Sequence, residues 1–119
     1  MRYDPAMSEA RLKSGFWVQA LVRGAQRHDA YAVVARKGDA DAGAILLKQS
    51  FLDGTCTVLS QLRAPDGRPA WRRATGPVPV PEAEADALIA RHLARDGDLW
   101  VVDIESPRGW LPEDCLVLG

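Results

Sequence analysis

The chain is poor in the residues that build most catalytic and metal sites. Its 119 residues include two histidines, His28 and His92, and two cysteines, Cys56 and Cys115. The cysteines are too few and too far apart in sequence for a metal knuckle, and we expect both to stay as thiols in a reducing cytosol. Neither histidine stands beside a serine or cysteine in a recognisable nucleophile motif. The sequence therefore predicts no catalytic residue, no metal site and no cofactor.

Long apolar runs and an excess of one charge are also missing. No run approaches the roughly 18 apolar residues that a membrane span requires, and residues 1–14 lack the apolar core of a signal peptide. Fifteen basic side chains against sixteen acidic ones give a formal net charge of −1, which provides no overall field to attract phosphate backbones or anionic membranes. We therefore expect a cytoplasmic protein with no membrane partner, in which nucleic-acid binding would need a local patch.

What the chain does contain is the composition of an ordinary packed domain. Hydrophobic residues make up 47% and charged residues 26%, close to the averages for soluble globular domains. A chain of this length has room for one domain. Residues 1–10 show no periodicity, so we expect a disordered or loosely docked N-terminus, followed by a single α+β domain over residues 11–119.

Two segments have the spacing of helices. Ser14 is a suitable cap for the first, whose apolar face is formed by Val18, Leu21, Val22 and Ala25. A short strand over residues 16–21 is the alternative, because aromatic and β-branched residues are dense there. The second helix begins near Pro81, ends near Gly97, and has a buried stripe formed by Ala85, Leu88, Ile89 and His92.

Several short apolar runs predict strands. Residues 31–37 and 43–49 are separated by a loop short enough for an antiparallel hairpin. Asp53-Gly54 predicts a turn into a strand over residues 55–63 that alternates as a sheet with one wet face requires, and residues 71–75 return as a fourth strand after a turn at residues 65–67. Residues 99–104 are apolar on both faces, and residues 115–118 are a candidate edge strand. The expected fold is α+β, a mainly antiparallel sheet of four to five strands packed by two helices.

The acidic loop between the first two strand-like runs is the first candidate site. We name Gly38, Asp39, Asp41 and Gly43 as a candidate binding loop. A calcium loop that begins at Asp39 fails, because its sixth position is Ala44 where glycine is required and its twelfth is Ser50 where glutamate is required. A phosphate cradle fails because the loop is acidic and opens a strand. The structural interpretation is a hairpin loop in which Asp39 or Asp41 accepts hydrogen bonds from nearby backbone amides and Gly38 or Gly43 has a positive φ.

The most basic segment is the second candidate. Trp71, Arg72 and Arg73 form a candidate partner surface, because an aromatic ring among arginines can stack on a base or bind a phosphate. The structural interpretation is a solvated strand face with Trp71 packed underneath.

Four segments of the chain together resemble a small alphaproteobacterial family that is catalogued as a domain of unknown function. They are Arg11-Leu12-Lys13, Trp17-Val18-Gln19-Ala20-Leu21 with Arg23, the block Arg36 to Gly43, and Asp98-Leu99-Trp100-Val101-Val102. The block is the most specific segment, and Gly97 stands where the family often has proline. The resemblance implies one compact cytoplasmic domain and supplies no activity.

Three functions are compatible with these features. The first is a non-catalytic binding or protein-interaction module, because no nucleophile, base and oxyanion set is assembled. The second is a small enzyme that uses Asp39 and Asp41 as acid–base groups or metal ligands, with His28 or His92 brought near by folding. The third and weakest is nucleic-acid binding through residues 71–73.

Overall fold

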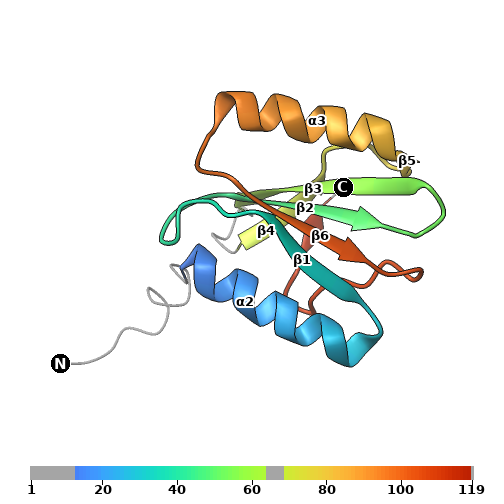
Figure 1. Cartoon of the computed structure of the whole chain (residues 1–119), viewed down its shortest axis with the longest axis horizontal. Coiled ribbons are helices and arrows are strands. Elements are labelled where there is room, and N and C mark those ends of the chain that lie inside the picture. Colours follow the sequence, from blue (N-terminus) through green and yellow to red (C-terminus); the bar gives the residue numbers. More distant parts are fainter. Residues whose placement is uncertain (1–12, 64–68, 119) are drawn as a thin grey trace.

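The structure is a computed structural model that describes residues 13–63 and 69–118. The expectations for residues 1–10 and for the turn at residues 65–67 lie outside the described residues. Figure 1 labels most of the helices and strands. They are α2 (Ser14–Ala25), η1 (Gln26–His28), β1 (Tyr31–Arg36), β2 (Ile45–Ser50), β3 (Thr55–Arg63), β4 (Pro69–Arg73), β5 (Val80–Pro81), α3 (Glu82–Arg95), β6 (Trp100–Glu105) and β7 (Val117–Leu118).

One mixed sheet of seven strands forms the centre of the described residues. Its order is β1-β6-β2-β3-β4-β7, and β5 pairs with β3. Strand β6 is antiparallel to β1 but parallel to β2, and β7 is parallel to β4. The expectation of a mainly antiparallel sheet of four to five strands was therefore wrong.

The predicted hairpin between β1 and β2 does not form, because β6 lies between them. Trp100, Val101 and Val102 at the start of β6 are all buried, and a strand that is apolar on both faces is most stable in the interior of a sheet. The loop from β1 to β2 consequently crosses over the start of β6 and does not form a hairpin turn.

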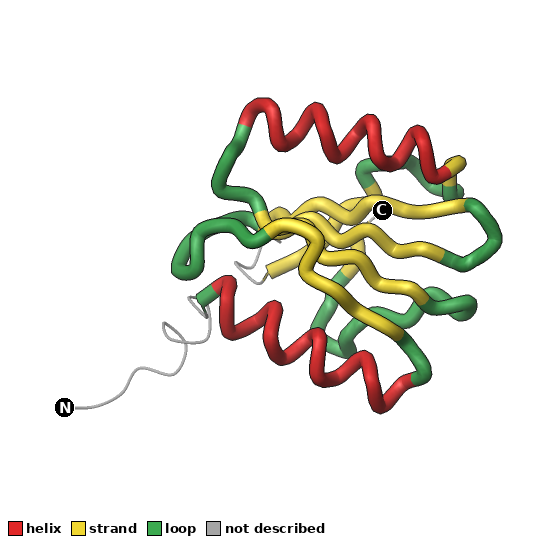
Figure 2. The backbone as a smooth tube through the Cα atoms, viewed as in Figure 1, coloured by secondary structure: helices red, strands yellow, loops and turns green. Residues whose placement is uncertain are grey.

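Helices cover both faces of the sheet, α3 on one side and α2 on the other (Figures 1 and 2). On the α2 side the core includes Val18 and Leu21 of the helix with Leu47 and Val102 of the sheet. On the α3 side the buried residues are Leu46, Cys56, Val58, Ala85, Ile89, Leu99 and Val101. Among the described side chains of β3, the predicted wet face is present only at Gln61, which is exposed. Thr57 and Leu59 on the same face are buried.

The helix predictions are confirmed in position. Helix α2 begins at Ser14, which excludes the alternative strand, but the serine does not cap it. Its hydroxyl instead donates to the carbonyl oxygen of Gly43 at 2.5 Å. Helix α3 follows Pro81 directly, and Ala85 and Ile89 are its buried residues. The edge strand predicted near the C-terminus is also present, as the two-residue β7.

Candidate functional site

The acidic loop passes so close to the start of β6 that two of its residues have no room for a side chain. A Cβ atom added to Gly38 would lie 2.2 Å from the carbonyl oxygen of Asp98, and one added to Gly43 would lie 2.4 Å from the same atom. The described glycines with positive φ are Gly54, Gly76 and Gly109. The prediction of a positive φ at Gly38 or Gly43 was therefore wrong, and close backbone approach is what requires glycine there.

Hydrogen bonds hold the loop to the core at this crossing. The amide of Asp39 donates to the carbonyl of Asp98 at 3.0 Å, and the indole Nε1 of Trp100 donates to the carbonyl of Asp39 at 2.7 Å. The amide of Gly15 at the start of α2 donates to the carbonyl of Ala40 at 2.9 Å. The loop thus joins β6 to the beginning of α2.

The acidic side chains of the loop have structural partners. One carboxylate oxygen of Asp39 accepts hydrogen bonds from the backbone amides of Ala42 at 2.9 Å and Asp41 at 3.3 Å. Asp41 lies 3.6 Å from the ammonium of Lys13 in an exposed ion pair. The predicted hydrogen bonding of an aspartate to nearby amides is confirmed at Asp39.

The histidines are engaged elsewhere in the fold. His28 stacks on Trp110 with ring centroids 5.4 Å apart, and Nδ1 of His92 lies 3.0 Å from the carbonyl oxygen of Leu88. In the part of the chain that the structure describes, no group of three or more His, Cys, Asp and Glu side chains is arranged to hold a metal ion. Both histidines thus have partners outside the acidic loop.

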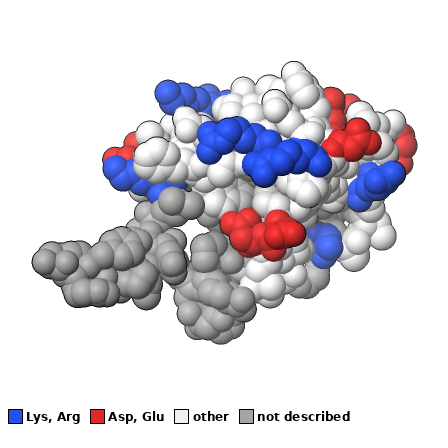
Figure 3. All heavy atoms as spheres, turned by 90° about the horizontal axis from the view of Figure 1, so that it is seen from below, with Lys and Arg blue, Asp and Glu red and all other residues white. Residues whose placement is uncertain are grey.

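The second candidate, on β4, has a buried tryptophan. Trp71 is 1% exposed, and its ring packs on Trp17 of α2 with centroids 5.3 Å apart. Arg72 and Arg73 are exposed. Figure 3 views the molecule from the α2 side and shows basic and acidic side chains interspersed. Any ligand surface here would have to be made by the arginines, because the ring offers no exposed face for stacking.

A charged cluster lies between the sheet and α3. The ammonium of Lys48, which is buried, lies 2.7 Å from a carboxylate oxygen of Glu82 and 2.8 Å from one of Asp86. Burial lowers the pKa of Lys48, but the hydrogen bonds that its ammonium donates to Asp86 and Glu82 outweigh burial and raise that pKa above its ordinary value. Asp103 lies beside Lys48 in the register of β2 and β6, and burial raises its pKa although Lys48 lowers it. This cluster attaches α3 to β2.

An uncovered strip of sheet lies beside α3. Val101 packs on the α3 side, so by alternation along β6 Asp103 and Glu105 face the same side. Their partners on β1 are Val33 and Tyr31, and opposed residues share a face. Helix α3 packs on β2, β3 and β5, which leaves this part of the sheet without a helix. We call Tyr31, Val33, Asp103 and Glu105 the open strip.

Strand β1 forms one end of the sheet and is unusually apolar for an edge. Tyr31 is 63% exposed, Val33 39% and Val34 38%. They account for three of the six large hydrophobic side chains that are exposed among the described residues. The other end of the sheet is β7, which is two residues long.

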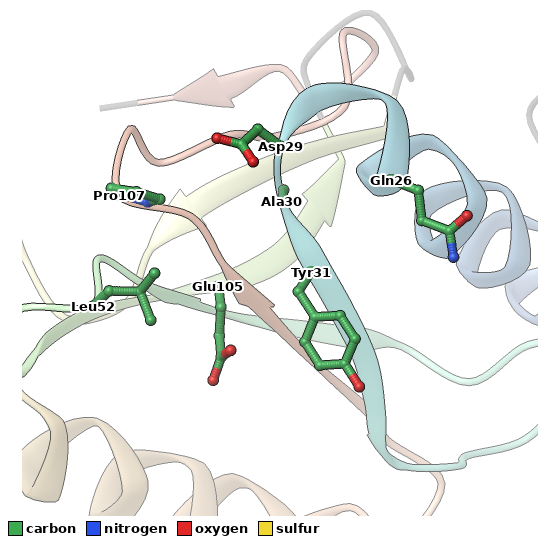
Figure 4. Close-up of a pocket in the computed structure, with 7 residues that line it drawn as sticks. All are labelled: Gln26, Asp29, Ala30, Tyr31, Leu52, Glu105 and Pro107. Carbon is green, nitrogen blue, oxygen red and sulfur yellow. The ribbon is translucent and has the colours of Figure 1, made fainter.

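An open pocket of about 510 Å³ lies at the beginning of β1. Its lining residues include Gln26, Asp29, Tyr31, Leu52, Glu105 and Pro107. Figure 4 shows Tyr31 and Glu105 extending side by side from neighbouring strands, with Leu52 beyond Glu105. The described residues contain two non-glycine residues with positive φ, Asp29 at 56° and Leu52 at 63°, and both line this pocket. Such a conformation is costly for leucine, and sites of this kind cluster where ligands bind.

The sequence predictions did not identify the open strip or the pocket. Residues 31–37 were expected to form a strand, but an apolar strand has the same pattern at an edge and in the interior. Leu52 and Glu105 gave no signal, since only the insertion of β6 brings them to the same end of β1.

Comparisons with known proteins identify relatives of the whole described domain. The family described as "Protein of unknown function (DUF1491)" matches residues 12–112. A DUF1491 family protein from Caulobacter crescentus CB15 in a crystal structure is 38% identical with a TM-score of 0.78, covering 90% of this chain and 99% of that one. Its NMR structure gives 37% and 0.74, covering 92% and 98%.

A more distant relative has the same architecture. Protein Atu0922 from A. tumefaciens, in a solution structure, is 31% identical with a TM-score of 0.71, and the alignment covers 81% of this chain and 86% of that one. Among curated proteins nothing matches the chain. Among the described helices, none is long and apolar enough to cross a membrane.

Proposed function

Because the chain belongs to the DUF1491 family, whose description gives no activity, we propose its function from the geometry of β1. It is a non-catalytic protein-interaction module that binds an extended polypeptide segment along the outer edge of β1. The open strip and the pocket at the beginning of β1 form the side-chain part of the same surface.

The observation that carries this proposal is the exposure of Tyr31, Val33 and Val34 on one edge strand. Alternate N–H and C=O groups of an edge strand face away from the sheet and are free to pair with another strand. Exposed apolar side chains on a strand edge normally favour aggregation, so natural proteins retain them mainly where a partner covers them. Strand addition is an established mode of peptide recognition.

The alternatives have less support. Asp39 already accepts hydrogen bonds from two backbone amides, and Asp41 pairs with Lys13. An enzyme based on this loop would therefore have no free, oriented base. Nucleic-acid binding through residues 71–73 lacks an exposed ring, because Trp71 is packed on Trp17.

We attribute the block from Arg36 to Gly43, which marks the family resemblance, to structure and not to ligand binding. The close approach of Gly38 and Gly43 to Asp98 supports this role. A cytoplasmic location also remains part of the proposal, and two free cysteines are compatible with it.

A photoreactive side chain placed on the strand tests the proposal. Val33 is replaced by p-benzoylphenylalanine in living alphaproteobacterial cells, and Val78, which is 65% exposed on the connector before α3, is replaced in a matched control. We expect a polypeptide adduct at position 33 and none at position 78 after irradiation. Equal labelling at both positions, or no adduct at position 33, would contradict the proposal.

A further inference from the structure

Strand β1 is self-complementary, and we infer that its partner is a second copy of this chain, paired antiparallel through β1 about a twofold axis. This inference rests on the proposed function and names the occupant of the same edge. Pairing of this kind joins two seven-stranded sheets into one and makes an isologous interface.

The centre of β1 has small apolar residues on both sides of Val33. The strand reads Tyr31-Ala32-Val33-Val34-Ala35-Arg36, so antiparallel pairing about Val33 sets alanine and valine against each other. A twofold axis perpendicular to the sheet keeps the α3 side of both copies on the same side. With Val33 opposite Val33, Ala32 lies opposite Val34, and each pair then shares a face because Ala32 and Val34 both pair with residues of the α2-side core.

The irregularity in β1 brings its basic end to the correct face. The register with β6 shifts between Val34 and Arg36, and Arg36 pairs with Val101 on the α3 side. Without the extra residue, Arg36 would lie on the opposite face from Tyr31. In the pair of copies, Arg36 of each copy lies beside Tyr31 of the other. Its guanidinium donates to the carbonyl oxygen of Gly97 at 2.9 Å in the single chain, and in the pair it turns to stack on the phenol ring.

The two ends of the strand carry opposite charges. Asp29 and Glu105 line the pocket at the beginning of β1, and Arg36 and Lys37 lie at the other end of this strand. All four side chains are exposed. Antiparallel pairing brings the basic end of each copy to the pocket of the other. Glu105 is two strands from the added strand, roughly 10 Å across the sheet, within the combined reach of an arginine and a glutamate.

The opposite edge does not offer this pairing. Strand β7 is two residues long, Val117–Leu118, and both are partly buried. Of the two edges that the structure describes, β1 alone has an exposed apolar centre between charges of opposite sign. The pairing therefore gives a closed dimer and not a fibre.

Self-association of the full chain is measured first, by sedimentation velocity over a concentration series. We expect a monomer–dimer equilibrium that Val33→Lys abolishes, because two ammonium groups would face each other at the axis. Val78→Lys, at an exposed position away from β1, is the control and should leave it unchanged. Circular dichroism checks that each variant folds, and Val33→Thr, which keeps the branched shape, replaces the lysine variant if it does not.

Exchange of the charges provides a test that only antiparallel pairing of β1 passes. The first variant is Asp29→Asn/Glu105→Lys, in which asparagine is chosen because it tolerates the positive φ at position 29. The second is Arg36→Glu/Lys37→Glu. Each alone should weaken self-association at least about tenfold, since like charges meet at both ends. Mixed together they should form a heterodimer, because substituted ends then meet each other and unsubstituted ends do too.

Three results would overturn the inference. The first is a wild-type chain that stays monomeric at every concentration. The second is a dimer that resists Val33→Lys, and the third is a pair of charge variants whose mixture fails to recover association. If self-association fails and position 33 cross-links to a different polypeptide in cells, the proposed interaction module stands while self-pairing falls. If it cross-links to nothing, both fall.

Discussion

A single methyl group at Gly38 tests the structural role of the acidic loop. In Gly38→Ala the new Cβ atom meets the Asp98 carbonyl oxygen at 2.2 Å, the Leu99 carbonyl carbon at 2.6 Å and the Trp100 amide nitrogen at 2.7 Å. All three are backbone atoms at the entry to β6, where Leu99 and Trp100 are buried, and they cannot rotate away. The loop must therefore move by roughly 1 Å to reach ordinary van der Waals distance.

The cost follows from the contacts that this movement breaks. Overpacking costs about 1–3 kcal/mol, and the hydrogen bonds from the Asp39 amide to Asp98 and from the Trp100 indole to Asp39 contribute about 1 kcal/mol each. We expect Gly38→Ala to lower the free energy of unfolding by about 3–5 kcal/mol, a large part of the total stability of a small domain.

Gly97→Ala is the matched control, because a Cβ atom there meets nothing within 4 Å. The same glycine-to-alanine change should then alter stability by no more than about 1 kcal/mol in either direction. Guanidinium denaturation followed by circular dichroism and tryptophan fluorescence measures both variants. If the Gly38 and Gly97 variants agree within about 0.5 kcal/mol, the close-approach explanation is refuted.

Three further predictions concern individual side chains. Asp39→Ala should lower the free energy of unfolding by about 1 kcal/mol, because two amides lose their acceptor, whereas Asp41→Ala should change it by less than about 0.5 kcal/mol; equal effects in denaturation would contradict this. Asp103→Asn should stabilise the protein at neutral pH, because burial raises the folded-state pKa of Asp103. The stability that this carboxyl contributes is then present below its unfolded pKa, near 4, and is lost as pH rises through its folded pKa. Thermal melts in which Asp103→Asn gives no increase in stability at neutral pH, or an increase that persists in acid, would refute this prediction. Cys115 is partly exposed, but burial raises its pKa to about 12, so it should react with a thiol reagent near pH 8 more slowly than free cysteine does; labelling of the folded protein as fast as that of free cysteine would contradict this.

The local elements could be predicted from the sequence because their signals are local. The spacing of Val18, Leu21 and Ala25 identified α2, and the acidic first turn after Pro81 identified the start of α3. The apolar runs identified β1, β2, β3 and β6. In each case the residues that determine the element lie within it.

Strand order could not be predicted, because it depends on pairs that are far apart in sequence. Leu46 pairs with Val101 on β6 and with Ser60 on β3, and a single sequence contains no record of which runs meet. The glycines of the acidic loop show the same limit. They were predicted to serve a hairpin loop through a positive φ, but what requires them is the backbone at Asp98, about sixty positions beyond Gly38 along the chain.

The most direct measurement of the central claim is amide hydrogen exchange along β1 in dilute and concentrated solutions of the wild-type chain. If β1 pairs with a second copy, the outward-facing amides among residues 31–34 should be unprotected when dilute and protected when concentrated, while amides of β3, in the interior of the sheet, stay protected in both. Exchange at residues 31–34 that is equally fast in both solutions would contradict self-pairing at this edge.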